Sequence, residues 1–225
     1  MVVVLKTAKS ACGNLIELKT FDKNLKNEKI LVIGVFHGDE PQGKYLIDEY
    51  LASTATAAET HNKSLLFIPC LNPDGMMKNT RTNSKGVDLN RNFPTKNWGQ
   101  NEGENASCDD ATTLYFGGVA PASEAETRFV VEVLEDYEPE LILTLHAPYK
   151  VVNYDGPAER VAQEISKIIG YPAEGSIGYP TPGSFGTYCG VERNIPTITL
   201  ELDEEIPVVQ LKEPVFKIFD FVAEL

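Results

Sequence analysis

The chain has 225 residues and a formal net charge of -13 at pH 7, with a sequence pI near 4.7. This acidity argues against nucleic acid or an anionic membrane surface as the main partner. It does not exclude a small anionic substrate, because a few arginines can dominate the field inside a cleft. No linker or composition break divides the sequence, so residues 1–225 are expected to form a single domain.

The N-terminus and the cysteines bear on the compartment. Met1–Lys6 is too short and too lightly charged for a signal peptide, and no apolar run approaches the roughly 20 residues of a membrane span. The four cysteines, Cys12, Cys70, Cys108 and Cys189, are scattered without a CxxC pair, which favours reduced thiols over a disulfide framework. We therefore predict a cytoplasmic protein without a membrane partner.

The first part of the chain alternates between strands and a helix. Val2–Leu5 and Leu15–Leu18 are short strand-like segments that are expected to form a hairpin. Lys29–Phe36 is a nearly continuous apolar run, which is typical of a strand covered on both faces. A helix is expected from Pro41 to about Ala52, and a second buried strand over Ser64–Cys70.

A long segment without periodicity follows, from Asn72 to about Ala122. It opens with Asn72-Pro-Asp-Gly75, which has strong turn chemistry, and it is rich in Asn, Gly, Asp and Thr. So long a stretch is unusual in a compact domain and is usually functional. Ser123-Glu-Ala-Glu126 is a capping-box pattern, which predicts a helix that runs to about Tyr137.

The second half of the chain continues the alternation. The expected elements are a strand over Leu141–Leu145, helices over Ala158–Ile169 and Ser184–Asn194, a strand over Thr197–Leu202, and a helix over Pro214–Leu225. This alternation predicts an α/β fold with a mixed, largely parallel sheet. In open sheets of this kind, ligands bind at the carboxyl ends of the strands.

Four chemically active side chains lie at or just past such strand ends: His37, Asn72, His146 and Glu201. His37 and Glu40 have i,i+3 spacing and would be neighbours on a first helical turn. A catalytic zinc site needs a third protein ligand, for which His146 is the obvious candidate. Spacing alone leaves open that His37 caps a helix and that His146 is a core histidine.

A second polar cluster runs from Arg81 to Pro94. Arg81 and Arg91 offer planar guanidinium forks, which suit carboxylate binding. Asp88 could orient a ligand histidine through its second ring nitrogen. The alternative is a solvated loop with ordinary surface arginines.

Glu201 ends the apolar strand Thr197–Leu202 on the face opposite Ile198. Partial burial would raise its pKa toward neutrality and make it a good general base, unless it only begins the acidic run that follows. Tyr179, in a Gly/Pro-rich loop, is typical of a lid or of a turn. Tyr188 is the competing tyrosine and is expected to pack in a helix.

These segments together resemble the zinc carboxypeptidase family in their order and rough spacing, from about Leu31 to Leu202. The matching segments are His37-Gly-Asp-Glu40, Asn72-Pro-Asp-Gly75, Thr80-Arg81-Thr-Asn83, Gly86-Val-Asp-Leu-Asn90-Arg91-Asn-Phe-Pro94, Ser123-Glu-Ala-Glu-Thr127, His146 and Ile198-Thr-Leu-Glu201. The resemblance implies a three-layer α/β fold with a central mixed β-sheet flanked by helices.

The resemblance also implies roles at the catalytic centre. One Zn²⁺ would be held by His37, Glu40 and His146. Glu201 would be the general base and then the acid, and Asp88 would be the hydrogen-bond partner of the first histidine.

The substrate-binding roles follow from the same resemblance. Arg81 would polarise the scissile carbonyl, Asn90 and Arg91 would bind the terminal carboxylate of the substrate, and Tyr179 would close over it. The spacing after Tyr179 differs by about one residue from the digestive enzymes. Those enzymes are longer, so their specificity pocket does not carry over.

The segment Tyr179-Pro-Thr-Pro-Gly-Ser-Phe-Gly186 and the compact chain are similar to bacterial murein peptide amidases. These cytoplasmic enzymes cut the γ-D-glutamyl–meso-diaminopimelate bond during peptidoglycan recycling, which implies a small murein tripeptide as the partner. Lys85 and the loop Trp98–Phe116 are candidates for reading the far end of diaminopimelate. A homodimer is left open.

Two other functions fit part of the pattern. Deacylases of small N-acyl amino acids, of the aspartoacylase and succinylglutamate desuccinylase type, share HxxE and the Asp-Leu-Asn-Arg run. Asn72–Gly75 and the Thr-Leu-Glu strand favour the peptidase. A zinc-bound but inactive binding module is disfavoured by the intact set of ligands and by Glu201.

Overall fold

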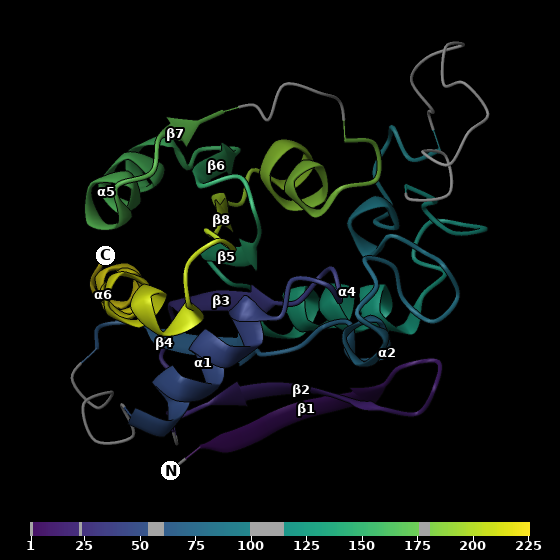
Figure 1. Cartoon of the computed structure of the whole chain (residues 1–225), viewed down its shortest axis with the longest axis horizontal. Coiled ribbons are helices and arrows are strands. Elements are labelled where there is room, and N and C mark those ends of the chain that lie inside the picture. The colour runs from purple at the N-terminus through teal and green to yellow at the C-terminus, as the bar shows by residue number, and fades with distance from the viewer. Residues whose placement is uncertain (1, 23, 54–60, 100–114, 176–180) are drawn as a thin grey trace.

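The computed structural model describes residues 2–22, 24–53, 61–99, 115–175 and 181–225. Within them, eight strands form one sheet in the order β1-β2-β4-β3-β5-β8-β6-β7, which Figure 1 shows from bottom to top. The strands are β1 (Val3–Lys9), β2 (Leu15–Thr20), β3 (Lys29–Gly34), β4 (Ser64–Ile68), β5 (Leu141–His146), β6 (Val151–Asp155), β7 (Ala173–Glu174) and β8 (Thr197–Glu201).

The sheet is mixed, with a parallel centre. The four central strands β4, β3, β5 and β8 run parallel to one another, so their carboxyl ends meet at one edge of the sheet. β1 and β2 form the expected antiparallel hairpin, β6 is antiparallel to β8, and β7 is parallel to β6. The predicted α/β class with a mixed sheet is confirmed.

Helices cover both faces of this sheet (Figure 1). On one face lie α1 (Gln42–Ser53), α5 (Glu159–Ile169) and α6 (Lys212–Glu224); on the other lie α4 (Ala125–Tyr137) and the helical turn η3 (Thr187–Val191). The expected three-layer architecture is therefore confirmed. No helix in the described residues is long and apolar enough to span a membrane.

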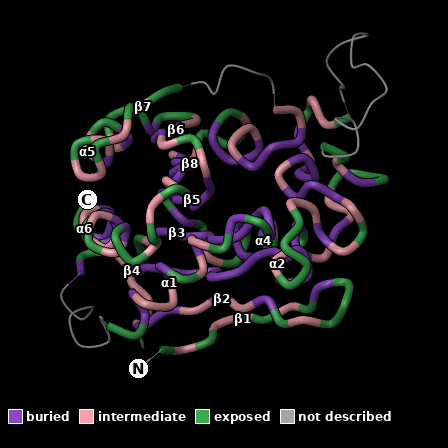
Figure 2. The backbone as a smooth tube through the Cα atoms, in the orientation of Figure 1, coloured by how far each residue is buried: buried purple, intermediate pink, exposed green. Residues whose placement is uncertain are grey.

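The apolar residues of β3 explain why both faces of the sheet are covered by helices. Ile30 and Val32 pack into the core under α1 and α6, while Leu31 and Ile33 face α4. All four are fully buried, and each contributes about 1.5–3 kcal/mol by leaving water. Figure 2 shows the same division, with the central strands buried and the outer helix faces exposed.

Several expectations about individual elements are wrong. β6 and β7 were not predicted, and β3 ends at Gly34 rather than at Phe36. Asn72 does not only turn the chain: its side chain caps the short helix α2 (Pro73–Lys78). The predicted capping box before α4 is absent, because the N-cap residue is Glu124 and no side chain bonds to the first turn.

The Ser123 hydroxyl bonds to the side chains of Asn92 and Glu124 and does not cap the helix. It accepts a hydrogen bond from Asn92 Nδ2 and donates one to Glu124 Oε1. Glu124 also accepts from Asn83 Nδ2, so the start of α4 is fixed to the long loop that precedes it. Two described residues of the loop between α2 and α4, Asn83 and Asn92, are thereby held against the start of α4.

Candidate metal centre and catalytic pocket

The strand-end residues meet at one edge of the sheet, as expected. His37 and Glu40 lie between β3 and α1, and His146 is the last residue of β5. Glu201 is the last residue of β8 and is the registered neighbour of His146. Parallel pairing of β3, β5 and β8 is therefore what brings these side chains together.

The turn that carries His37 and Glu40 is tight and unusual. Both residues precede α1, which begins at Gln42, so the expected first helical turn is wrong; a turn closed by a 3.2 Å bond from Glu40 N to His37 O replaces it. Val35 has a φ of +56°, an uncommon conformation for a β-branched residue and one that concentrates at functional sites. Gly38 passes so close to α2 that a Cβ would lie 2.0 Å from Gly75 C.

The three proposed ligand side chains converge. His37 Nδ1 lies 2.7 Å from Glu40 Oε1, and His146 Nδ1 lies 3.0 Å from Glu40 Oε2. The two Nδ1 atoms are 3.3 Å apart, and all three side chains are buried. Two imidazole nitrogens and one carboxylate oxygen within 4.8 Å of one another are the donor set of a catalytic zinc site, so the residues fit the metal.

The charges around this cluster favour a bound cation. Burial favours neutral His37, but the charges of Glu40 and Asp88 outweigh burial and raise the pKa of His37 to about 9. Burial also opposes ionisation of Glu40, but His37 and His146 outweigh it and hold the pKa of Glu40 well below its usual range. Metal binding would therefore displace a proton from His37.

Asp88 connects the metal ligands to Arg81. Its Oδ1 lies 3.2 Å from His37 Nε2, the ring nitrogen that points away from Glu40, and its Oδ2 accepts a 3.0 Å bond from Arg81 Nε. Asp88 is fully buried; burial disfavours its charge, but His37 and Arg81 outweigh burial and lower its pKa. Arg81 Nη1 is 3.8 Å from Glu40 Oε1, so the guanidinium lies beside the metal ligands.

Asn72 holds the backbone that carries Arg81. The Arg81 carbonyl accepts bonds from Asn72 Nδ2 and Gly38 N, both at 3.3 Å. Asn72 Oδ1 in turn accepts a 2.9 Å bond from Gly75 N. The Asn-Pro-Asp-Gly motif thus positions the arginine.

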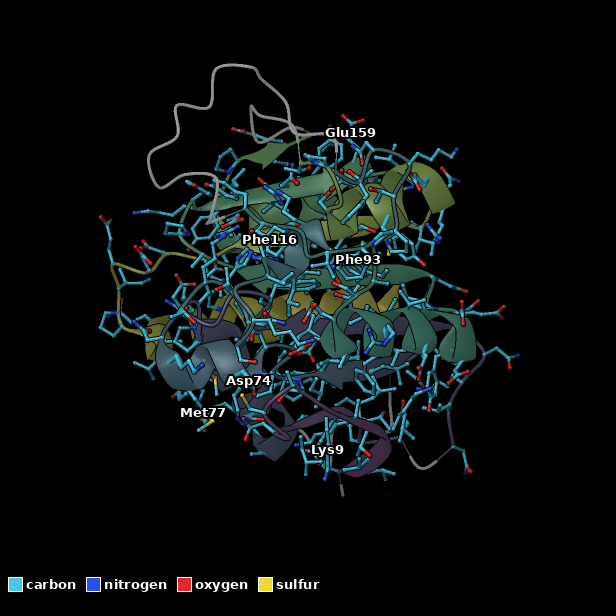
Figure 3. The ribbon with its side chains drawn as sticks, turned by 90° about the vertical axis from the view of Figure 1, so that its right-hand side faces the viewer. Lys9, Asp74, Met77, Phe93, Phe116 and Glu159 are labelled. Atoms are coloured by element: carbon cyan, nitrogen blue, oxygen red, sulfur yellow. The ribbon has the colours of Figure 1, made fainter. Side chains whose placement is uncertain are left out.

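Asp74, in the same motif, lies beside the β1–β2 hairpin near Lys9 (Figure 3). It is 2% exposed, and its two oxygens accept four hydrogen bonds. The donors are Ser10 Oγ at 2.5 Å, Asn14 Nδ2 at 2.8 Å, Cys12 N at 3.0 Å and Ser84 Oγ at 2.8 Å. One buried carboxylate therefore joins the hairpin to the loop on which Arg81 lies.

Asn90, Arg91 and Tyr115 line the same pocket as the metal ligands and Arg81 and form part of its wall. Asn90 Oδ1 accepts a 2.8 Å bond from Phe185 N, and Arg91 Nη1 donates a 2.8 Å bond to Asn90 O. The Tyr115 ring centroid is 5.4 Å from the Cζ atoms of both Arg81 and Arg91. Sequence reasoning included Tyr115 only as part of the candidate loop Trp98–Phe116, because nothing in the motif pattern separates it from the other residues of that loop.

Glu201 has an unpaired oxygen in this wall. Within the described residues, the buried Oε2 of Glu201 has no hydrogen-bond partner. Burial raises the pKa of Glu201, the direction expected of a general base. The strand alternation predicted this environment, and the solvated alternative is wrong because Glu201 is 8% exposed.

One pocket of about 280 Å³ contains these groups. Of the predicted site residues, it is lined by His37, Glu40, Arg81, Asn90, Arg91, His146 and Glu201. Asp88 lies behind this wall, and Tyr179 falls outside the described residues. Lys85 does not line the pocket and pairs with Glu124 at 3.3 Å, whereas Asp155, from the unpredicted strand β6, does line it.

Comparison with known proteins agrees with this geometry. The sequence profile of the zinc carboxypeptidase family matches residues 1–205. Murein peptide amidase A of Escherichia coli K12 is 30% identical over 179 residues, which are 77% of this chain and 71% of that protein. The Vibrio campbellii enzyme of the same name is 32% identical over 189 residues, 78% of this chain and 70% of its own length.

Solved structures give the same result. Murein-tripeptide amidase from Escherichia coli O157 superimposes with a TM-score of 0.80 at 26% identity, covering 98% of this chain and 92% of that one. Thrombin-activatable fibrinolysis inhibitor, at 19% identity and a TM-score of 0.78, shares the fold over 99% of this chain and 68% of its own. The chain belongs to the zinc carboxypeptidase family, a family of zinc-dependent hydrolases.

Proposed function

We propose that the chain hydrolyses the peptide amide bond next to a C-terminal residue, and that its substrate is the γ-D-glutamyl–meso-diaminopimelate bond of murein peptides. The observation that carries the reaction type is that one pocket holds a His-Glu-His cluster, an unpaired buried carboxylate and two guanidinium groups. The murein substrate rests on the names of the relatives and of the solved structure reported above.

In this proposal His37, Glu40 and His146 hold the metal. Zinc, when bound, supplies Lewis-acid chemistry that lowers the pKa of water toward about 7 and polarises a carbonyl. Glu201 takes the proton of the attacking water at its unpaired oxygen and later delivers it to the leaving amine. The burial of Glu201 supports this role because it raises the pKa of the carboxyl group. The raised pKa lies nearer to the pKa values of the water and the amine between which Glu201 moves the proton.

The arginines bind and orient the substrate. Arg81, which is held by Asp88 and lies beside Glu40, faces the place where negative charge develops on the scissile carbonyl. Arg91 and Asn90 bind the terminal carboxylate, for which a guanidinium offers paired donors. Asp88 keeps the His37 ring in place, and we retain Tyr179 as the lid candidate.

The wider setting is part of the same proposal. We extend the proposal to a single domain that acts in the cytoplasm on peptides released from peptidoglycan; the names of the murein peptide amidase relatives support the class of substrate. The small N-acyl amino acid deacylase is not favoured, because the profile match and both curated relatives lie on the peptidase side.

The test is product analysis by mass spectrometry with purified L-alanyl-γ-D-glutamyl-meso-diaminopimelate and the zinc-loaded protein. We expect free diaminopimelate and L-alanyl-D-glutamate from the wild type and none from Glu201→Gln. N-acetyl-aspartate and N-succinyl-glutamate should remain intact. Hydrolysis of either acyl amino acid without cleavage of the tripeptide would reject the proposal.

A further inference from the structure

One aromatic side chain in the catalytic pocket lies beside both of its arginines. The Tyr115 ring centroid is 5.4 Å from the Cζ atoms of Arg81 and of Arg91, and all three side chains line the pocket. Both distances are within the roughly 6 Å at which a ring face attracts a cation. A single tyrosine thus contacts the two cations to which the proposed function gives different parts of the substrate.

The backbone next to Tyr115 is fixed to the segment that carries Arg91. Phe116 O accepts a 2.9 Å bond from Asp88 N, the residue whose carboxylate holds Arg81. Gly117 approaches the same segment so closely that a Cβ would lie 2.4 Å from the Arg91 carbonyl oxygen. The two residues that follow Tyr115 therefore place its ring beside both guanidinium groups.

The Tyr115 side chain has no evident packing role. It is 48% exposed and belongs to neither apolar core, and its hydroxyl has no hydrogen-bond partner in the described part of the chain. The contacts that its ring makes there with charged groups are the two with Arg81 and Arg91. The position of the ring is therefore explained by the arginines and not by the fold.

The two arginines differ in what else holds them. Arg81 Nε donates a 3.0 Å bond to the buried carboxylate of Asp88. Among the described residues, Arg91 has no acidic partner within ion-pair distance, and its Nη1 donates a 2.8 Å bond to the backbone oxygen of Asn90. Arg91 is also only 7% exposed, and a ring attracts a cation most strongly when the cation is shielded from water. Arg91 should therefore depend on Tyr115 more than Arg81 does.

We infer that Tyr115 is a positioning residue whose ring holds the guanidinium groups of Arg81 and Arg91 in the orientation in which they bind the substrate. This inference rests on the proposed function for the tasks of the two arginines. An arginine that is already held loses less side-chain freedom when a carboxylate binds, so the contact should lower KM, mainly through Arg91. The attraction comes from the face of the ring, so the hydroxyl is not needed.

The first test is the steady-state kinetics of variants with L-alanyl-γ-D-glutamyl-meso-diaminopimelate. Tyr115→Leu removes the ring and keeps an apolar side chain, and Tyr115→Gln removes the ring in a form suited to a half-exposed position. Both should raise KM about 3- to 30-fold, the range of a cation–π contact, and should lower kcat less than about 3-fold, because Asp88 still holds Arg81. Tyr115→Phe keeps the ring and should keep the KM of the wild type.

The matched control is Phe116→Leu. Phe116 is the next residue and is also exposed, but it does not line the pocket and has no arginine within contact distance in the described part of the chain. Its replacement should leave KM and kcat unchanged. Equal KM values in Tyr115→Leu, Tyr115→Gln and the wild type, or a KM raised as much by Tyr115→Phe as by Tyr115→Leu, would overturn the inference.

A measurement without substrate separates this inference from the proposed function. The order parameters of the arginine Nε–H groups can be obtained by 15N relaxation, with the signals assigned through Arg81→Lys and Arg91→Lys. The value for Arg91 should be high in the wild type and in Tyr115→Phe and should fall below about 0.6, the range of flexible groups, in Tyr115→Leu. The value for Arg81 should change less.

The two measurements have distinct failures. If the tripeptide is not cleaved but Arg91 loses order in Tyr115→Leu and not in Tyr115→Phe, the reaction proposed above fails while the role of Tyr115 stands. Unchanged order of Arg91 in Tyr115→Leu would reject that role whether or not the peptide is cleaved.

Discussion

Replacing Asp74 by Asn should destabilise the protein by about 2–4 kcal/mol. The Asp74 oxygens accept four hydrogen bonds, two on each oxygen. Asn keeps one acceptor oxygen, and its amide then faces the Cys12 N–H and the Ser84 hydroxyl. The hydroxyl can rotate to accept, but the N–H cannot, so one buried donor is left unpaired and the remaining bonds lose the charge that strengthens them.

Urea denaturation of the zinc-loaded protein, followed by circular dichroism, measures this change. The matched control is Asp136→Asn, because Asp136 pairs with Lys6 at 2.7 Å but is 54% exposed, so its removal should cost under about 1 kcal/mol. Limited proteolysis should also cut the loop that carries Ser84 sooner in Asp74→Asn. If the two variants have the same unfolding free energy, Asp74 does not join the hairpin to this loop as we describe.

Three more outcomes are expected. Burial opposes ionisation of Asp74, but the four hydrogen-bond donors outweigh burial and lower the pKa of Asp74. The stability that Asp74 contributes is therefore present above the pKa of the unfolded chain, about 3.9, and is lost as the pH falls. The difference in urea midpoint between the wild type and Asp74→Asn should shrink below about pH 4. Asp88→Asn should weaken zinc affinity about 10- to 100-fold, measured by competition with a chromogenic chelator, because the His37 ring loses its charged partner; unchanged affinity would remove Asp88 from the site. Gly38→Ala should reduce the urea midpoint sharply, because its Cβ would overlap the Gly75 backbone; a wild-type midpoint would contradict the close approach.

Much of the fold follows from local pattern. The uninterrupted apolar runs of β3, β4 and β5 predicted strands covered on both faces, and their polar ends predicted where the site lies. Asp88 was predicted as a partner of a ligand histidine, and its carboxylate lies 3.2 Å from His37 Nε2. The strands could be predicted because each depends on the pattern of one short segment, and the site because the ends of parallel strands share an edge. The pairing of Asp88 with His37, 51 residues away, followed instead from the resemblance to the zinc carboxypeptidases.

The remainder depends on contacts distant in sequence. β6 was missed because Val151–Asp155 is short and its pairing with β8 is visible only in the folded chain. Asp155 was missed with it, since nothing local distinguishes a pocket carboxylate from a solvated one. The capping box before α4 failed for a similar reason: Asn92, 31 residues before Ser123, supplies a tertiary hydrogen bond that replaces the local one.

We propose that His37, Glu40 and His146 hold one catalytic zinc and that Glu201 acts on water beside it. Zinc content per chain, measured by mass spectrometry after stripping and reloading of the wild type, His146→Ala and Glu201→Gln, tests it directly. We expect about one zinc in the wild type and in Glu201→Gln, and well under one in His146→Ala, because two remaining ligands do not make a site. Full zinc retention by His146→Ala, or loss of zinc from Glu201→Gln, would contradict the account.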